Sequence, residues 1–166
     1  NEEPVLHELY RRVKEVMDKT GEAWELVLVN DGSRDRSGEI IAELHALDAR
    51  VKGFSFSRNF GFQVAVTAGL DHASGDAVVL TDADLQDPPE LIVEMVKKWK
   101  EGFKVVAGKR KSRPGDSWLK AYTARKFYKI INRISTVPIP HNTGDFRLMD
   151  RQVVDTIKQV GERTRF

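Results

Sequence analysis

Cysteine is absent from the 166-residue sequence. Its absence excludes a disulfide scaffold, a zinc–thiolate site and a thiol nucleophile. Also missing are a signal-peptide pattern and any apolar run near the roughly 18 residues of a membrane-spanning helix. The 40% hydrophobic content is typical of globular chains, and the length is close to the roughly 150 residues of one domain. We therefore expect residues 1–166 to form a single globular domain.

Acidic residues are scarce in one basic stretch. Residues 109–133 contain nine Lys and Arg side chains and a single acid, Asp116, so this stretch has a formal charge of +8. The whole chain has a charge of only +2, which leaves −6 on the other residues. Such a concentration favours an anionic partner, such as phosphate, nucleic acid or lipid headgroups. The alternative interpretation is an ordinary solvated helix face.

Helical and β-rich patterns alternate along the chain. Apolar residues at helical spacing predict helices near residues 5–17, 40–47, 64–72, 91–99, 117–134 and 152–160. Short β-rich runs predict strands near residues 24–29, 51–57, 77–81, 104–108 and 146–149. Asn1 is the expected cap of the first helix and Asp87 that of the fourth. Right-handed crossovers between such elements predict an α/β fold with a mostly parallel sheet and helices on both faces.

Polar residues follow each of the first four predicted strands. The clusters are Asn30–Ser33, Ser57–Asn59, Asp82–Asp87 and Lys109–Arg110. Each alone is compatible with ordinary turn chemistry. Because ligands of such sheets bind beyond the carboxyl ends of the strands, the four clusters together predict one large polar site.

The acidic run after the third strand has alternating polar residues. In an extended segment, Asp82, Asp84 and Gln86 would face the same way. Their oxygens suit a hard cation, Mg²⁺ or Mn²⁺, rather than zinc. Two neighbouring carboxylates without a cation would repel each other. The alternative is structural, with Asp87 capping a helix and Asp82 ending a strand.

A second alternating pair lies near the carboxyl end of the chain. Asp145 and Arg147 are separated by one residue and are therefore expected to share a face of a strand. They form either part of the site or a simple surface ion pair. No metal-ligand spacing links the four histidines.

At this point the motifs resemble a known family. The segments Asn30–Ser33, Asp82–Glu90, Gly108–Arg110 and Asn142–Arg151 are similar to those of family 2 GT-A glycosyltransferases. The most similar branch is that of the polyprenyl-phosphate glycosyltransferases, which includes dolichol-phosphate mannose synthases and bactoprenol glucosyltransferases. The resemblance covers essentially the whole chain and implies one GT-A catalytic domain. It also implies truncation at both ends, because the family's opening strand and its later membrane helices are missing from residues 1–166.

The resemblance implies roles for individual residues. Asp84 and Gln86 would bind the metal, Asp145 would occupy the proposed base position, and Arg147 would lie near the acceptor phosphate. The nucleotide sugar would be bound by Glu2, Val29, Asp31, Asp82, Ala83, Arg110 and Arg125.

The reaction that the resemblance implies is an inverting hexose transfer from a nucleotide diphosphate sugar to a polyprenyl phosphate. UDP-glucose is the favoured donor and GDP-mannose the next. The expected location is the cytoplasmic face of a membrane, with the basic 109–133 stretch facing anionic headgroups and no nucleic-acid partner. Two alternatives stay open: a family 2 enzyme with a hydroxyl acceptor, and a non-catalytic module that binds acidic surfaces.

Overall fold

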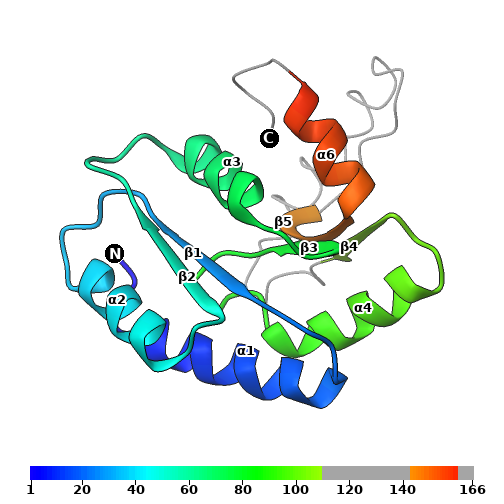
Figure 1. Ribbon diagram of the computed structural model, residues 1–166, viewed down its shortest axis with the longest axis horizontal. Helices are drawn as coiled ribbons and strands as arrows, with labels where there is room; N and C mark the ends of the chain where they lie inside the picture. The colour runs from blue at the N-terminus through cyan, green and yellow to red at the C-terminus, as the bar shows by residue number, and fades with distance from the viewer. Residues whose placement is uncertain (110–142, 161–166) are drawn as a thin grey trace, which may run out of the picture.

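The computed structural model describes residues 1–109 and 143–160 (Figure 1). The helices are α1 (Leu6–Thr20), α2 (Ser37–Leu47), α3 (Phe62–His72), α4 (Ile92–Lys100) and α6 (Arg151–Gln159), with a short 3₁₀ helix, η1 (Pro89–Leu91). The strands are β1 (Leu26–Asn30), β2 (Val51–Ser55), β3 (Ala77–Leu80), β4 (Val105–Lys109) and β5 (Thr143–Asp150). The α/β alternation predicted from the sequence is confirmed for these residues, whereas the helix predicted near residues 117–134 lies outside them.

The strands form two small sheets rather than one mostly parallel sheet. Strands β1 and β2 are parallel, with Leu26 opposite Val51 and Asn30 opposite Ser55. Strand β5 runs antiparallel between β3 and β4. The expectation of a mostly parallel sheet was wrong in this respect. It assumed that every strand follows a short right-handed crossover, but β5 comes after the long segment 110–142 and is not bound by that rule.

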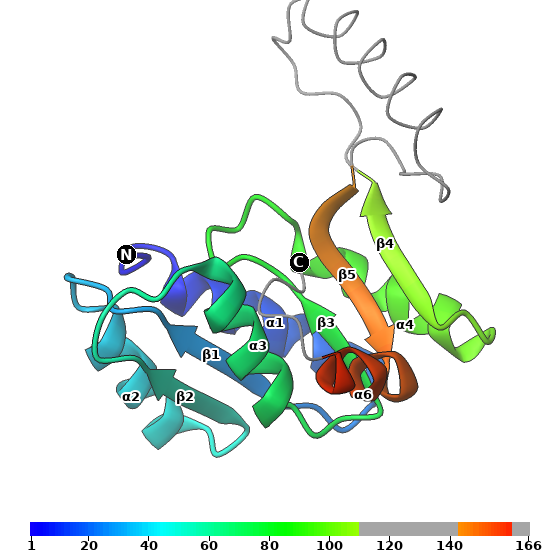
Figure 2. The ribbon, with the colours of Figure 1, turned by 90° about the horizontal axis from the view of Figure 1, so that it is seen from above.

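Helices cover both sides of the strands, as the sequence predicted. Figures 1 and 2 show α1, α2 and α4 on one side and α3 and α6 on the other. The core has three clusters of buried residues. One joins α1 and α2 to β1 and β2, one joins α1 and α4 to β5, and one joins α3 and α6 to β5. Within the described residues, no helix is both long and apolar enough to cross a membrane.

Two helix starts differ from their sequence predictions. Helix α1 begins at Leu6 after Val5, without a side-chain cap, because the Asn1 side chain instead accepts a hydrogen bond from the Arg34 backbone at 2.7 Å. Helix α4 begins at Ile92, after η1. A residue that precedes proline is pushed out of the helical region, and Pro88, before Pro89, is accordingly extended at ψ 123°. Asp87 therefore does not cap α4.

Candidate functional site

The end of β1 carries a turn that its own side chains hold in place. Asn30 is buried, and its Oδ1 atom accepts the backbone N–H of Ser33 at 2.9 Å. Both carboxylate oxygens of Asp31 also accept backbone hydrogen bonds, from Phe60 at 2.6 Å and from Gly61 at 2.9 Å. The loop after β1 is thus joined to the loop after β2, and the structure brings these two predicted polar clusters together.

Gly32 allows the closest approach between these two loops. Its φ of +66° lies in the left-handed region, and a Cβ atom added there would be 2.4 Å from the Arg58 carbonyl carbon. Only glycine fits both conditions without strain. The Asn-Asp-Gly-Ser turn therefore has a local structural reason as well as a proposed functional one.

The first residues of the chain lie against the start of α2. The backbone N–H of Glu2 donates to Ser37 Oγ at 3.0 Å, and that of Arg36 donates to Glu3 Oε2 at 3.2 Å. Ser37 is only 3% exposed, so this contact holds the Glu2 backbone beside the β1 turn. Glu2 and Asp31 were both predicted to bind the nucleotide, and the structure places them on neighbouring segments. Val29 was also predicted to bind the nucleotide, but its side chain packs toward α3, near Gly69.

The acidic run after β3 shows the predicted alternation only in part, because Asp84 is half-buried, as Ala83 and Leu85 are. Asp82 and Gln86 are exposed, whereas Ala83 and Leu85 pack against the core cluster of α1, α2, β1 and β2. The Oδ1 atom of Asp84 accepts the backbone N–H of Gln86 at 3.0 Å. That hydrogen bond closes a turn, so the run is not the extended segment that the prediction assumed, although Ala83 and Leu85 still pack on the core side.

Leu85 gives this run an unusual backbone. Its φ is +60°, a left-handed conformation that costs a non-glycine residue about 1–2 kcal/mol. Nothing in the sequence predicts this conformation, because leucine normally avoids it. Strained residues of this kind cluster at binding and catalytic sites.

A divalent cation fits the donors of the acidic run, although they do not form a complete cage. Among residues 1–109 and 143–160, no three His, Cys, Asp or Glu side chains gather closely enough to hold a metal ion. Magnesium sites in nucleotide enzymes usually have one or two carboxylates, with substrate phosphates and waters completing the shell. Asp84 and Gln86, with Asp82 nearby in sequence, are a donor set of that incomplete kind.

The far end of the acidic run is attached to α1. Arg12 makes a two-pronged ion pair with Glu90, with N–O distances of 2.9 and 2.6 Å. Asp87 and Pro89, which come just before Glu90 in the sequence, are buried. Sequence reasoning missed Arg12, because 78 residues separate it from Glu90 and no spacing rule connects them.

Strand β5 brings Asp145 and Arg147 to the edge that carries the acidic run. Arg147 lies opposite Leu80, the last residue of β3, and Asp82 and Asp145 each lie two residues beyond this pair. A guanidinium nitrogen of Arg147 is 2.9 Å from Asp145 Oδ1, while Phe146 between them is buried. The shared face predicted for Asp145 and Arg147 is confirmed, and the two side chains form an ion pair.

Some predicted residues cannot be placed at the site. Arg110 and Arg125 lie outside the described residues, as does most of the basic 109–133 stretch. Two surface hollows, of about 490 and 350 Å³, are lined by other residues, around Trp24 and Arg50 in the first case and Ile41 and Phe54 in the second. Neither hollow is lined by a residue of the acidic run or by Asp145 or Arg147.

Fold and site together define an α/β protein with hard oxygen donors and a nearby acid–arginine pair at one edge of its strands. The chain belongs to glycosyl transferase family 2, whose family model matches residues 1–158. Membership implies the GT-A fold, and it confirms the resemblance noted in the sequence. The two small sheets are the part of that fold seen in the described residues.

Several relatives match over the whole chain. It is 55% identical over 166 residues to an uncharacterized glycosyltransferase, YkcC, of Bacillus subtilis, covering 100% of this chain and 51% of the relative. It is 48% identical over the same length to the bactoprenol glucosyl transferase of Shigella phage SfV, covering 54% of that protein. A prophage bactoprenol glucosyl transferase homolog of Escherichia coli is 46% identical, with 54% coverage. The chain thus spans about half the length of these relatives.

Proposed function

We propose that this chain is the catalytic domain of a metal-dependent inverting glycosyltransferase that moves a hexose from a nucleotide diphosphate sugar to a polyprenyl phosphate. The observation that carries the proposal is the acidic run, with Asp82 and Gln86 exposed while Ala83 and Leu85 pack on the core. A diphosphate brings the oxygens that such a donor set lacks. The names of the bactoprenol glucosyl transferases support glucose and a polyprenyl carrier.

The donor would lie along the strand edge. Glu2 would help to hold the nucleotide, Asp31 and the backbone of Val29 would contact its base or ribose, and Asp82 and Ala83 would line it. Asp84 and Gln86 would hold Mg²⁺ or Mn²⁺, which when bound stabilises the negative charge on the leaving diphosphate. Arg110 and Arg125 would add positive charge there. UDP-glucose is the proposed donor, and GDP-mannose is the next.

The Asp145–Arg147 pair supports a role for these two residues at the acceptor. A phosphate oxygen of the polyprenyl carrier attacks the anomeric carbon, the bond to the nucleoside diphosphate breaks on the opposite face, and the configuration inverts. A phosphate monoester is already largely ionised near neutral pH, since its second pKa is about 6. The reaction therefore needs little proton abstraction, and an aspartate engaged by arginine at 2.9 Å suits orientation of the acceptor. We place this reaction at the cytoplasmic face of a membrane, with the 109–133 stretch against its headgroups.

Nucleotide and metal binding can be tested on the 166-residue chain. A thermal-shift panel of UDP-, GDP- and dTDP-sugars, with and without Mn²⁺, should show a metal-dependent rise in melting temperature for UDP-glucose. Asp84→Ala should abolish the metal-dependent part. Asp71→Ala is the matched control, because Asp71 is an exposed residue of α3. A shift that Asp84→Ala leaves unchanged would remove Asp84 from the metal site.

The acceptor is tested separately, in membranes that contain the protein and a labelled sugar nucleotide. A polyprenyl phosphate acceptor predicts a lipid-soluble, acid-labile product, whereas a hydroxyl acceptor in polysaccharide synthesis predicts a product without these properties. A non-catalytic surface-binding module would show no metal-dependent heat with nucleotide and Mn²⁺ in a calorimeter.

A further inference from the structure

Leu85 is exceptional in its backbone conformation. Among the described residues, five have a positive φ, and the other four are glycines at positions 21, 32, 61 and 102. Glycine adopts this conformation without steric cost, and leucine does not. A leucine is therefore expected here only if its side chain contributes something that glycine cannot.

The side chain of Leu85 makes the contact that glycine would lack. It packs, half-buried, against the core cluster formed by α1, α2, β1 and β2. The acidic run leaves β3, which belongs to the other sheet. The Leu85 side chain thus attaches the loop that follows β3 to the core cluster beside the β1–β2 sheet. Figure 1 shows this loop passing from β3 back toward α4.

The left-handed turn at Leu85 sets the positions of its two neighbours. Asp84 and Gln86 flank it, and the Gln86 backbone N–H donates to Asp84 Oδ1 at 3.0 Å. This hydrogen bond closes a tight turn whose central residue is Leu85. Because the Leu85 side chain packs against the core cluster, the turn that carries both polar residues is attached to the core at its central residue.

We propose that Leu85 is the positioning residue of the metal site: its anchored side chain holds a left-handed turn that orients Asp84 and Gln86 before a divalent ion binds. This inference rests on the proposed function, in which Asp84 and Gln86 are the protein's ligands. Leu85 itself touches neither metal nor substrate. Its contribution is to order the two ligand residues before the ion binds, which reduces the entropic cost of binding.

Three substitutions of Leu85 distinguish the effect of its side-chain contact with the core from the effect of its left-handed backbone conformation. Leu85→Gly permits the left-handed turn but removes the side chain, Leu85→Ala removes the anchor and keeps a Cβ atom, and Leu85→Met keeps an apolar side chain of similar volume. Leu47→Ala is the control, because Leu47 is a leucine that is 73% exposed at the end of α2.

Two measurements are made well below the melting temperature of each variant. The first is the Mn²⁺ affinity in the presence of UDP, by titration calorimetry. We expect about tenfold weaker binding in Leu85→Ala and Leu85→Gly, which corresponds to about 1.4 kcal/mol, and a change under about twofold in Leu85→Met and Leu47→Ala. The second is hydrogen exchange of the Gln86 amide, which should become faster in Leu85→Ala and Leu85→Gly only.

The outcomes distinguish this inference from the proposed function. If the unsubstituted chain binds Mn²⁺ and UDP but Leu85→Ala and Leu85→Gly bind equally well, the inference is overturned and the proposed function stands. A loss of stability without a change in Mn²⁺ affinity is the signature of a merely structural role and also overturns it. If the unsubstituted chain binds no Mn²⁺ with UDP, the proposed function fails. The Gln86 exchange rate then decides alone whether Leu85 orders the turn: an unchanged rate overturns the inference, and a faster rate in both variants supports it.

Discussion

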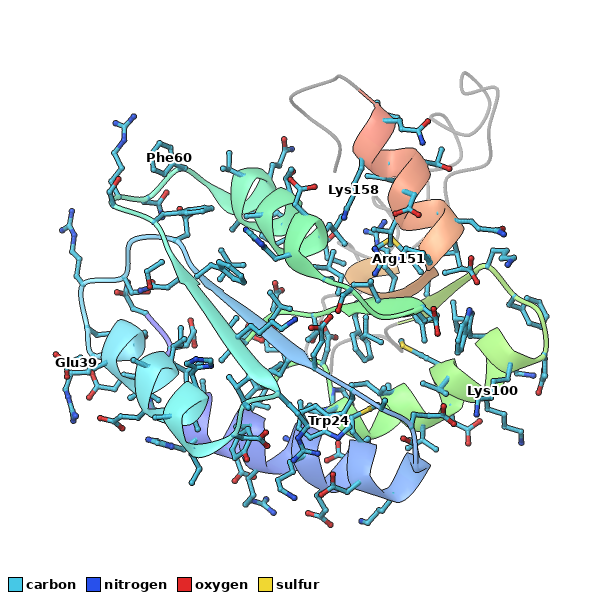
Figure 3. All side chains as sticks on the ribbon, in the orientation of Figure 1. Trp24, Glu39, Phe60, Lys100, Arg151 and Lys158 are labelled. Atoms are coloured by element: carbon cyan, nitrogen blue, oxygen red, sulfur yellow. The ribbon has the colours of Figure 1, made fainter. Side chains whose placement is uncertain are left out.

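The Asp31 carboxylate accepts the backbone N–H of Gly61 across the gap between the loops that follow β1 and β2. The distance is 2.9 Å, and the second oxygen of Asp31 accepts the neighbouring Phe60 N–H at 2.6 Å. Figure 3 shows Phe60 in the loop that connects β2 to α3. A residue that family resemblance assigns to nucleotide binding therefore also fixes the shape of the strand edge.

Replacing Asp31 by Asn should loosen this pair of loops. An amide keeps one acceptor oxygen but points an NH₂ group at the other backbone N–H. We expect a loss of about 1–3 kcal/mol in the free energy of unfolding, as for a broken charge-assisted hydrogen bond, measured by urea denaturation. Asp71→Asn, on the exposed surface of α3, should change it by less than about 0.5 kcal/mol. Equal values for the two variants would contradict the role assigned to Asp31.

Gly32→Ala should cost more than Gly21→Ala, although both glycines have similar φ values of +66° and +71°. At Gly21 a Cβ atom would meet nothing within 4 Å, so only the backbone cost of about 1–2 kcal/mol applies. At Gly32 the Cβ atom would also be 2.5 Å from the Asn59 nitrogen, and overpacking typically adds about 1–3 kcal/mol. Thermal unfolding of both variants gives the difference. A Gly32 variant as stable as the Gly21 variant would show that the loops can separate without cost.

The lowered pKa of Glu25 predicts that the protein loses stability in acid. Burial raises the pKa of its carboxyl. Hydrogen bonds from Lys52, at 2.5 Å, and from the backbone and hydroxyl of Ser74 lower this pKa by more than burial raises it, and the result is about 2. Because the folded pKa is below the ordinary 4.5, the stabilisation is complete above pH 4.5 and is lost as the pH falls toward 2.

Glu25→Gln should therefore lower the unfolding free energy at pH 7 by about 1.5–3 kcal/mol, the range for hydrogen bonds to a charged group. The difference from the unsubstituted chain should nearly vanish at pH 2. Urea denaturation between pH 2 and 7 measures both. Glu94→Gln, on the exposed side of α4, serves as the control, and a constant difference across this pH range would exclude the ionised carboxylate as the cause.

Asp145→Asn should slow transfer far more than it weakens nucleotide binding. The substitution breaks the ion pair with Arg147, and a misplaced acceptor can reduce a rate by about 10²-fold. We expect that loss in kcat, measured with polyprenyl phosphate in membranes, and a change under about threefold in the Kd for the sugar nucleotide. Similar losses in both quantities would make Asp145 a binding residue instead.

The sequence predicted which segments become helices and strands more accurately than how the strands pair. Apolar periodicity located all five described strands, because side-chain burial repeats locally. The antiparallel direction of β5 depends on residues 78 and 149 meeting, and no local pattern encodes that. At the site, the alternation of Asp82, Asp84 and Gln86 was visible in the sequence, whereas the positive φ of Leu85 and the Arg12–Glu90 pair arise only from tertiary packing.

The central place of β5 has a consequence for the order in which the protein forms. Strands β3 and β4 are separated by β5, whose residues 143–150 are synthesised long after residue 109. Until β5 leaves the ribosome, both of its neighbours have open backbone edges, which are templates for aggregation. The β1–β2 sheet is complete by residue 55 and can assemble early. The β3–β5–β4 sheet forms only after residues 143–150 are made, and pairing between segments so far apart in the sequence slows folding. A nascent chain halted near residue 109 should therefore depend on chaperones, and that dependence should end once β5 has emerged.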